Sequence, residues 1–167
     1  MSRTPIFPIA QRLFLILSGI LFGGLTTIGF LVTPTLFNYL DDKQVAGMIA
    51  GEIFKNASVF SLIISVFLLI FANLLIKRGY EGYKTIRWLL LLGILLTLIG
   101  SFIIQPMMHE LRETALNQGA PVMQSPYASE FSLLHRISST LFVIEVILCG
   151  WVYWVSAQYK PMRQNLT

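Results

Sequence analysis

Charged residues are scarce in this sequence. Only 12% of its 167 residues are Asp, Glu, Lys or Arg, and 55% are hydrophobic. Soluble domains usually carry about 25% charged residues. The composition therefore excludes an ordinary soluble domain and indicates a lipid environment. The net charge of +4 does not point to nucleic acid, because the basic residues stand beside long apolar runs, where they orient membrane proteins.

Residues suited to catalysis are equally rare. The chain has one cysteine, Cys149, and two histidines, His109 and His135. A single cysteine excludes an intramolecular disulfide framework. Neither a glycine-rich phosphate loop after a strand nor a nucleophile elbow occurs. We therefore predict that the protein is not an enzyme and uses no cofactor.

Long uncharged runs dominate what is present. They predict one membrane domain over residues 1–167, with spans at about 13–36, 57–77, 86–106 and 137–157, since a helix needs roughly 20 apolar residues to cross a bilayer. The fold class that we expect is an all-α, integral membrane four-helix bundle. The first run is too long for a signal-peptide core and lacks an A-x-A-like cleavage site, so we interpret it as a retained helix.

The basic residues predict the orientation. Four of them fall in the short connection between the second and third spans: Lys77, Arg78, Lys84 and Arg87. Positive residues favour the cytoplasmic side of a membrane. With an even number of spans, the N- and C-termini are then cytoplasmic as well, and the first and third connections face outward.

Small residues recur at intervals of four in two spans. The first span carries Gly19, Gly23 and Thr27, and the third carries Gly93 and Thr97. Such stripes let helix backbones approach closely in a membrane. We expect them to pack within the bundle, so that Gly23→Leu disrupts it more than Leu21→Phe does. The alternative is that one stripe binds a second copy of the chain or another membrane protein.

A proline late in each of the first and third spans, Pro34 and Pro106, predicts a kink or a helix end. Asp41 is then placed to cap a short amphipathic helix on the outer face. Residues 107–117 predict a second short outer helix. The first of these helices contains a close-approach pair of glycines, Gly47 and Gly51.

Glu145 is the most informative residue, because an ionisable group inside a span is costly and needs either a functional or a structural explanation. At helical spacing it shares one face with three other polar residues: Ser138, Cys149 and Ser156. One interpretation is a proton carrier, an ion or metal ligand, or a gate. The other is a neutral carboxyl group that bonds to a hydroxyl of another span. The candidate partners are Thr26, Thr27, Thr97 and Ser101.

The histidines provide a weak metal hypothesis. His109 and Glu113 are one helical turn apart, and His135 could approach them if the outer connection folds back. Nearby methionines would add soft ligands for copper: Met107, Met108 and Met123. The second histidine of the zincin pattern is missing, and no C-x-x-C-H haem attachment occurs. We therefore predict no bound metal and interpret both histidines as interfacial.

Four short motifs carry a family resemblance. They are Gly29-Phe30 with Thr33-Pro34-x-Leu36-Phe37, Ala46-Gly47-x-x-Ala50-Gly51-x-x-Phe54, Gln105-Pro106-Met107, and Leu134-His135-x-x-Ser138. As a set they make the chain resemble the transmembrane-protein-205-like family, long catalogued as a domain of unknown function. The resemblance implies a bacterial inner-membrane protein with four spans, and it brings no agreed activity or catalytic residues.

Three functional hypotheses follow. The first is a non-enzymatic accessory or interaction component of a membrane assembly, with the lipid bilayer and a membrane protein or second copy as partners and no role for nucleic acid. The second is a small transport or resistance protein that moves an ion, metal or apolar solute by way of Glu145. The third is a copper- or haem-binding redox protein that uses His109 and His135.

Overall fold

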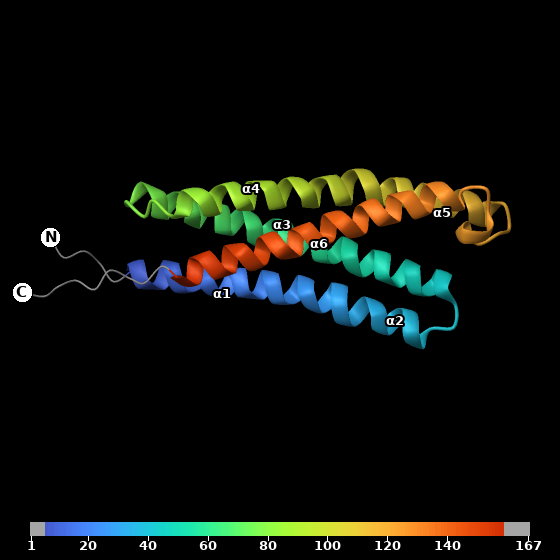
Figure 1. Cartoon of the computed structure of the whole chain (residues 1–167), viewed down its shortest axis with the longest axis horizontal. Coiled ribbons are helices and arrows are strands. Elements are labelled where there is room, and N and C mark those ends of the chain that lie inside the picture. Colours follow the sequence, from blue (N-terminus) through green and yellow to red (C-terminus); the bar gives the residue numbers. More distant parts are fainter. Residues whose placement is uncertain (1–5, 159–167) are drawn as a thin grey trace, which may run out of the picture.

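Four long helices make up the protein. The computed structural model describes residues 6–158, with side chains from residue 9, and contains no strand within that range. The elements are α1 (Ile6–Thr27), the π-helical turn η1 (Ile28–Val32), α2 (Thr33–Tyr39), α3 (Lys43–Lys77), α4 (Tyr83–Ile99), the π-helical turn η2 (Gly100–Ile104), α5 (Gln105–Asn117), the 3-10 turn η3 (Val122–Gln124) and α6 (Ala128–Gln158). The first long helix continues from α1 through η1 into α2, and the third continues from α4 through η2 into α5. Figure 1 shows how the four long helices lie side by side.

All four helices are long and apolar enough to cross a membrane. They run over Ile9–Tyr39, Lys43–Lys77, Tyr83–Asn117 and Ala128–Gln158. Their outward faces carry many exposed large apolar side chains, such as Phe60, Phe102 and Trp154. This exposure suits a lipid environment, in which a helix needs no polar outer face. The predicted all-α four-helix membrane bundle is confirmed.

The chain turns place three segments at the same end of the bundle. The start of α1, the turn between α3 and α4, and the end of α6 lie at one end (Figure 1). We call this the turn end. The connections α2–α3 and α5–α6 lie at the opposite end, which we call the loop end. The prediction that the turn end faces the cytoplasm still depends on the basic residues alone.

A glycine follows the last turn of α3 at the turn end and of α5 at the loop end. Gly79 follows α3 with a φ of 94°, and Gly119 follows α5 with a φ of 79°. The N–H of Tyr80 then bonds to the Leu75 carbonyl, and the N–H of Ala120 bonds to the Ala115 carbonyl. These are the bonds of a Schellman motif, in which glycine accepts the left-handed backbone that other residues resist.

The two prolines do not end their helices. A proline inside an α-helix has no N–H for the ladder, and its ring collides with the carbonyl four residues earlier. Here a wider π turn precedes each proline. The N–H of Thr33 bonds to the Ile28 carbonyl before Pro34, and the N–H of Gln105 bonds to the Gly100 carbonyl before Pro106. The helices therefore continue to Tyr39 and Asn117, and the predicted helix end at each proline is wrong.

The predicted short outer helices are also not separate elements. Residues 43–56 form the first turns of α3, which runs unbroken from Lys43 to Lys77. Its N-cap is Asp42 rather than Asp41, and the Asp42 carboxylate accepts from the N–H groups of Gln44 and Val45. Residues 107–117 belong to α5, which continues α4. Gly47 and Gly51 each disfavour a helix by about 1 kcal/mol, which is too little to end α3, and the π turn before Pro106 carries the helix past that proline.

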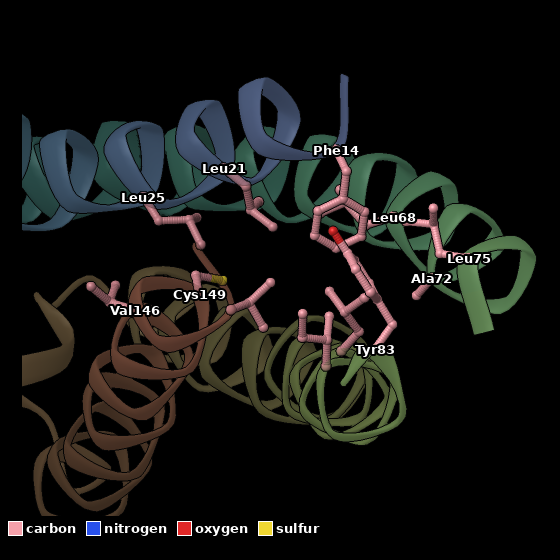
Figure 2. Close-up of a cluster of buried hydrophobic side chains, with 12 residues drawn as sticks. Phe14, Leu21, Leu25, Leu68, Ala72, Leu75, Tyr83, Val146 and Cys149 are labelled. Carbon is pink, nitrogen blue, oxygen red and sulfur yellow. The ribbon is translucent and has the colours of Figure 1, made fainter. Parts of the chain in front are cut away.

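The apolar core lies toward the turn end. It gathers buried side chains of α1, α3, α4 and α6, shown in Figure 2: Phe14, Leu21, Leu25, Leu68, Ala72, Leu75, Tyr83, Ile86, Leu90, Val146, Cys149 and Val152. Phe14 meets Tyr83 edge-on, with ring centroids 5.2 Å apart. This half of the bundle is therefore filled with side chains.

The packing prediction for the small residues is wrong at Gly23. A Cβ at Gly23 or Gly93 would meet nothing within 4 Å, and Thr27 is exposed, whereas Leu21 is buried in the core. The core face of α1 follows Phe14, Leu21 and Leu25, and Gly23 and Thr27 lie outside that face.

Gly19, which belongs to the predicted stripe, does pack against another helix, and Gly150 of α6 marks the same contact. A Cβ at Gly19 would lie 3.3 Å from the Tyr153 ring, and one at Gly150 would lie 3.0 Å from the Phe22 ring. Large rings of the opposite helix therefore occupy the space beside these two glycines, which is the role expected of small residues at a membrane helix interface.

Candidate functional site

Glu145 joins three helices in the middle of the bundle. Its side chain on α6 is buried, with 8% of the residue exposed. Its Oε1 atom lies 2.9 Å from the Ser61 hydroxyl of α3 and 2.7 Å from the Thr97 hydroxyl of α4. The predicted partner Thr97 is therefore correct. Thr26 instead donates to the Phe22 carbonyl of its own helix.

The predicted polar face of α6 does point inward. Cys149 and Ser156 are buried and Ser138 is half-buried. Cys149 packs in the apolar core, and the Ser156 hydroxyl donates to the Tyr153 carbonyl of its own helix. These two side chains therefore contribute to the packing of the bundle and do not line the cavity. Glu145 and Ser138 instead line an open space.

The hydrogen bonds of Thr97 allow Glu145 to be either neutral or ionised. The Thr97 Oγ1 atom lies 2.9 Å from the Gly93 carbonyl as well as 2.7 Å from Glu145. A hydroxyl group has one hydrogen, so it can donate to only one of them. If Glu145 is ionised, both hydroxyls donate to it. If Glu145 is neutral, its own O–H can donate to Thr97, whose hydrogen then goes to Gly93.

A cavity of about 480 Å³ extends from Glu145 toward the loop end. One wall comes from η1, α2 and α3, with Gly29, Phe30, Thr33, Phe37, Gly47, Ala50, Gly51, Phe54 and Ser58. The other comes from α4, η2, α5 and α6, with Leu96, Thr97, Gly100, Ser101, Gln105, Met108, His135, Ser138, Ser139, Leu141, Phe142, Val143 and Glu145. The volume falls within the range of roughly 300–1,000 Å³ that is usual for small-molecule sites.

Both π turns contribute to this cavity. Phe30 lies in η1 and Ser101 in η2, and Thr33 and Gln105 directly follow these turns. π turns inside α-helices are frequent at functional sites. Gly29 is also required there, because a Cβ at this position would collide with the Phe142 ring of α6. The backbone irregularity caused by the two prolines thus shapes the cavity walls.

The cavity reaches the loop end at His135, Gln105 and Met108. The His135 ring stacks on Phe131, with centroids 6.4 Å apart and planes 8° from parallel. The Arg112 guanidinium lies 5.5 Å from the centroid of the same Phe131 ring. Aromatic and cationic side chains therefore surround the outer end, whereas Glu145 lies at the inner end.

The described residues gather no metal site. Among side chains 9–158, no three His, Cys, Asp or Glu residues are grouped to hold an ion. His109 Nδ1 lies 3.9 Å from Glu113 Oε1, and both side chains are largely exposed. His135 instead faces Phe131 and the cavity. The absence of bound metal stays a prediction, but this donor set offers little support for the redox hypothesis.

Sequence reasoning missed Ser61 as a partner of Glu145. The signal was present, because Ser58, Ser61 and Ser65 recur on one face of the second span. Gly47 and Gly51 were expected to form a close-approach pair, and they line the cavity instead. A Cβ at Gly47 would reach Phe37 at 3.8 Å, and one at Gly51 would reach Arg112 at 3.9 Å.

Residues from all four sequence motifs meet at the cavity. The first provides Gly29, Phe30, Thr33 and Phe37, the second Gly47, Ala50, Gly51 and Phe54, the third Gln105, and the fourth His135 and Ser138. The family described as a domain of unknown function (DUF4149) matches residues 16–117. That range holds Ser61 and Thr97 but ends before Glu145. No curated protein and no solved structure matches the chain.

Proposed function

Because the chain belongs to the DUF4149 family, whose function is unknown, we propose its function from the cavity: a non-enzymatic membrane protein that binds a small solute beside Glu145. The observation that carries the proposal is the cavity of about 480 Å³ that ends at a buried carboxyl group. Mostly apolar pockets with a few converging polar groups are the usual form of small-molecule sites. This proposal favours the transport or resistance hypothesis.

The same proposal includes the setting of the protein. It is a multi-pass protein of the bacterial inner membrane, with the turn end in the cytoplasm and the cavity nearer the outer face. The four basic residues around the α3–α4 turn support this orientation. We also propose that the chain is related to the transmembrane-protein-205-like family. Residues from the four motifs that carry this resemblance line one cavity, which supports the proposal.

An accessory role in a membrane assembly is the second candidate. One observation favours it: Gly23, Gly24 and Thr27 leave an exposed strip of small residues on α1, with open space beside both glycines. Small residues on a lipid-facing surface allow another helix to pack closely. Such a partner or a second copy would occupy the outside of the bundle and leave the cavity free.

Cysteine reactivity tests whether solutes enter the cavity. In a Cys149→Ser background, Ser101→Cys places a thiol in the cavity wall, and Ser65→Cys places one at a buried position of α3 outside the cavity lining. A small water-soluble thiol reagent applied to the detergent-purified protein should modify the first and spare the second. Equal protection of both thiols would contradict the proposed binding function.

A further inference from the structure

We infer that the cavity selects a hydrophobic organic cation, with the positive group against Glu145 and the apolar body along the phenylalanine rings. The inference depends on the proposed function, since it names the class of solute that the cavity takes. Three features support it: an available carboxylate oxygen, the charge of the lining, and the aromatic wall.

The first feature is the second oxygen of Glu145. Ser61 and Thr97 both contact Oε1. No donor among residues 9–158 contacts Oε2. Glu145 is only 8% exposed, and it lines the cavity. An oxygen atom that opens on the cavity and has no protein donor is free to accept a hydrogen bond from a bound molecule. A cationic solute would supply the missing partner from the cavity side.

The hydroxyl partners are suited to the charge change that such binding requires. While the cavity is empty, a neutral Glu145 can donate to Thr97, and Thr97 to the Gly93 carbonyl. When a cation arrives, the Glu145 proton leaves to water and Thr97 turns its hydrogen from Gly93 to Oε1. The carboxylate then accepts from both hydroxyls and faces the cation, so the charge of the site is conserved.

The second feature is the charge of the lining. Among the lining residues of the described chain, Glu145 is the one carboxylate, and neither lysine nor arginine occurs. The other titratable side chain there is His135, which is exposed at the loop end. The fixed positive group nearest the lining is Arg112, beside Gly51 and Phe131 at the outer end. At the inner end an anion finds no such group, whereas a cation finds a carboxylate at short range in a medium of low dielectric.

The third feature is the aromatic wall. Phe30, Phe37, Phe54 and Phe142 all line the cavity. The rings of Phe54 and Phe142 meet edge-on with centroids 5.0 Å apart. Aromatic faces attract organic cations and bury their apolar substituents. Glu145 lies near the middle of α6, away from both helix ends, so a lipid headgroup at the membrane surface is a poor candidate for the cation.

Binding of tetraphenylphosphonium tests the inference, with tetraphenylborate as a probe of the same four-phenyl form and opposite charge. Radiolabelled tetraphenylphosphonium should bind saturably to the purified wild-type protein, and radiolabelled tetraphenylborate, measured in a separate sample because the two ions pair with each other, should not. Glu145→Gln should weaken binding roughly tenfold to hundredfold, as expected for loss of an interaction with a charged group. Ser65→Ala, a buried change outside the cavity lining, should bind as the wild type does.

Saturable binding of tetraphenylborate, or unchanged affinity for tetraphenylphosphonium in Glu145→Gln, would overturn the choice of a cation while leaving solute binding intact. The separate measurements on wild-type protein decide this even if the Glu145 variant fails to fold. Reaction of the Ser101→Cys thiol without any tetraphenylphosphonium binding would also overturn the solute class alone. If the thiol reagent instead fails to modify the Ser101→Cys protein, the proposed function itself is contradicted.

Discussion

Replacing Glu145 by leucine removes the acceptor that links α6 to α3 and α4. The two contacts measure 2.9 Å to Ser61 and 2.7 Å to Thr97. Interhelical hydrogen bonds in membrane proteins contribute about 0.6 kcal/mol on average and about 1.7 kcal/mol at most. Losing both should therefore lower the free energy of unfolding by about 1.2 kcal/mol, with a ceiling of about 3.4 kcal/mol.

The two partners should not contribute equally. After Glu145→Leu, the Thr97 hydroxyl can still donate to the Gly93 carbonyl 2.9 Å away. The Ser61 hydroxyl has no second acceptor among residues 9–158. Ser61→Ala should therefore show the larger coupling to Glu145→Leu in a double-mutant cycle. Glu145→Gln should cost less than Glu145→Leu, because its amide oxygen can accept the same two bonds.

Reversible unfolding in mixed micelles, with increasing dodecyl sulfate, measures these free energies. Ser65→Ala is the matched control, since Ser65 is buried one turn along α3 and is not bonded to Glu145. We expect a coupling of about 0.6 kcal/mol for the Ser61 cycle and none for the Ser65 cycle. Strictly additive losses from Glu145→Leu and Ser61→Ala would refute the assigned hydrogen bond.

Three further predictions concern orientation, packing and metal content. In a Cys149→Ser background, an impermeant thiol reagent outside intact cells should label a cysteine at Gln118 and spare one at Gly82; the reverse pattern would invert the topology. Leu21→Ala should cost about 2 kcal/mol, the low end of the range for core truncations, because the separated helix is still in an apolar medium. Gly23→Ala should change stability little, because nothing lies within 4 Å of its added Cβ; similar losses measured by detergent unfolding would contradict this core assignment. Elemental analysis and an optical spectrum should show no stoichiometric copper, zinc or haem, and one metal per chain that is lost when both histidines are replaced would revive the redox hypothesis.

The sequence was sufficient for the number of helices and for the inward direction of Glu145. Long uncharged runs have one explanation in a chain of this length, because lipid requires apolar helices. A carboxyl group inside such a run must turn toward other protein groups, so its hydroxyl partners could be narrowed to a few residues. Thr97 was among them. These inferences depend only on the length and polarity of single helices, which can be read from the sequence.

The sequence was insufficient where the answer depended on the relative rotation of helices. Gly23 and Leu21 are two residues apart, and only the packing angle of α1 decides which of them meets the core. The prolines posed a similar problem. An α-helix can respond to Pro34 or Pro106 by ending, bending or widening, and the widening seen here cannot be read from a local pattern. The cavity was missed for the same reason, since it arises between walls from distant parts of the chain.

The two π turns have a mechanical consequence. Each one interrupts the regular ladder of its helix next to a proline, at the level where the cavity begins. A helix bends most easily where its ladder is interrupted. Bending at the π turns would move the segments beyond them, Thr33–Tyr39 and Gln105–Asn117. The outer part of the cavity would then change in width, while the bonds of Glu145 to Ser61 and Thr97 would stay in place.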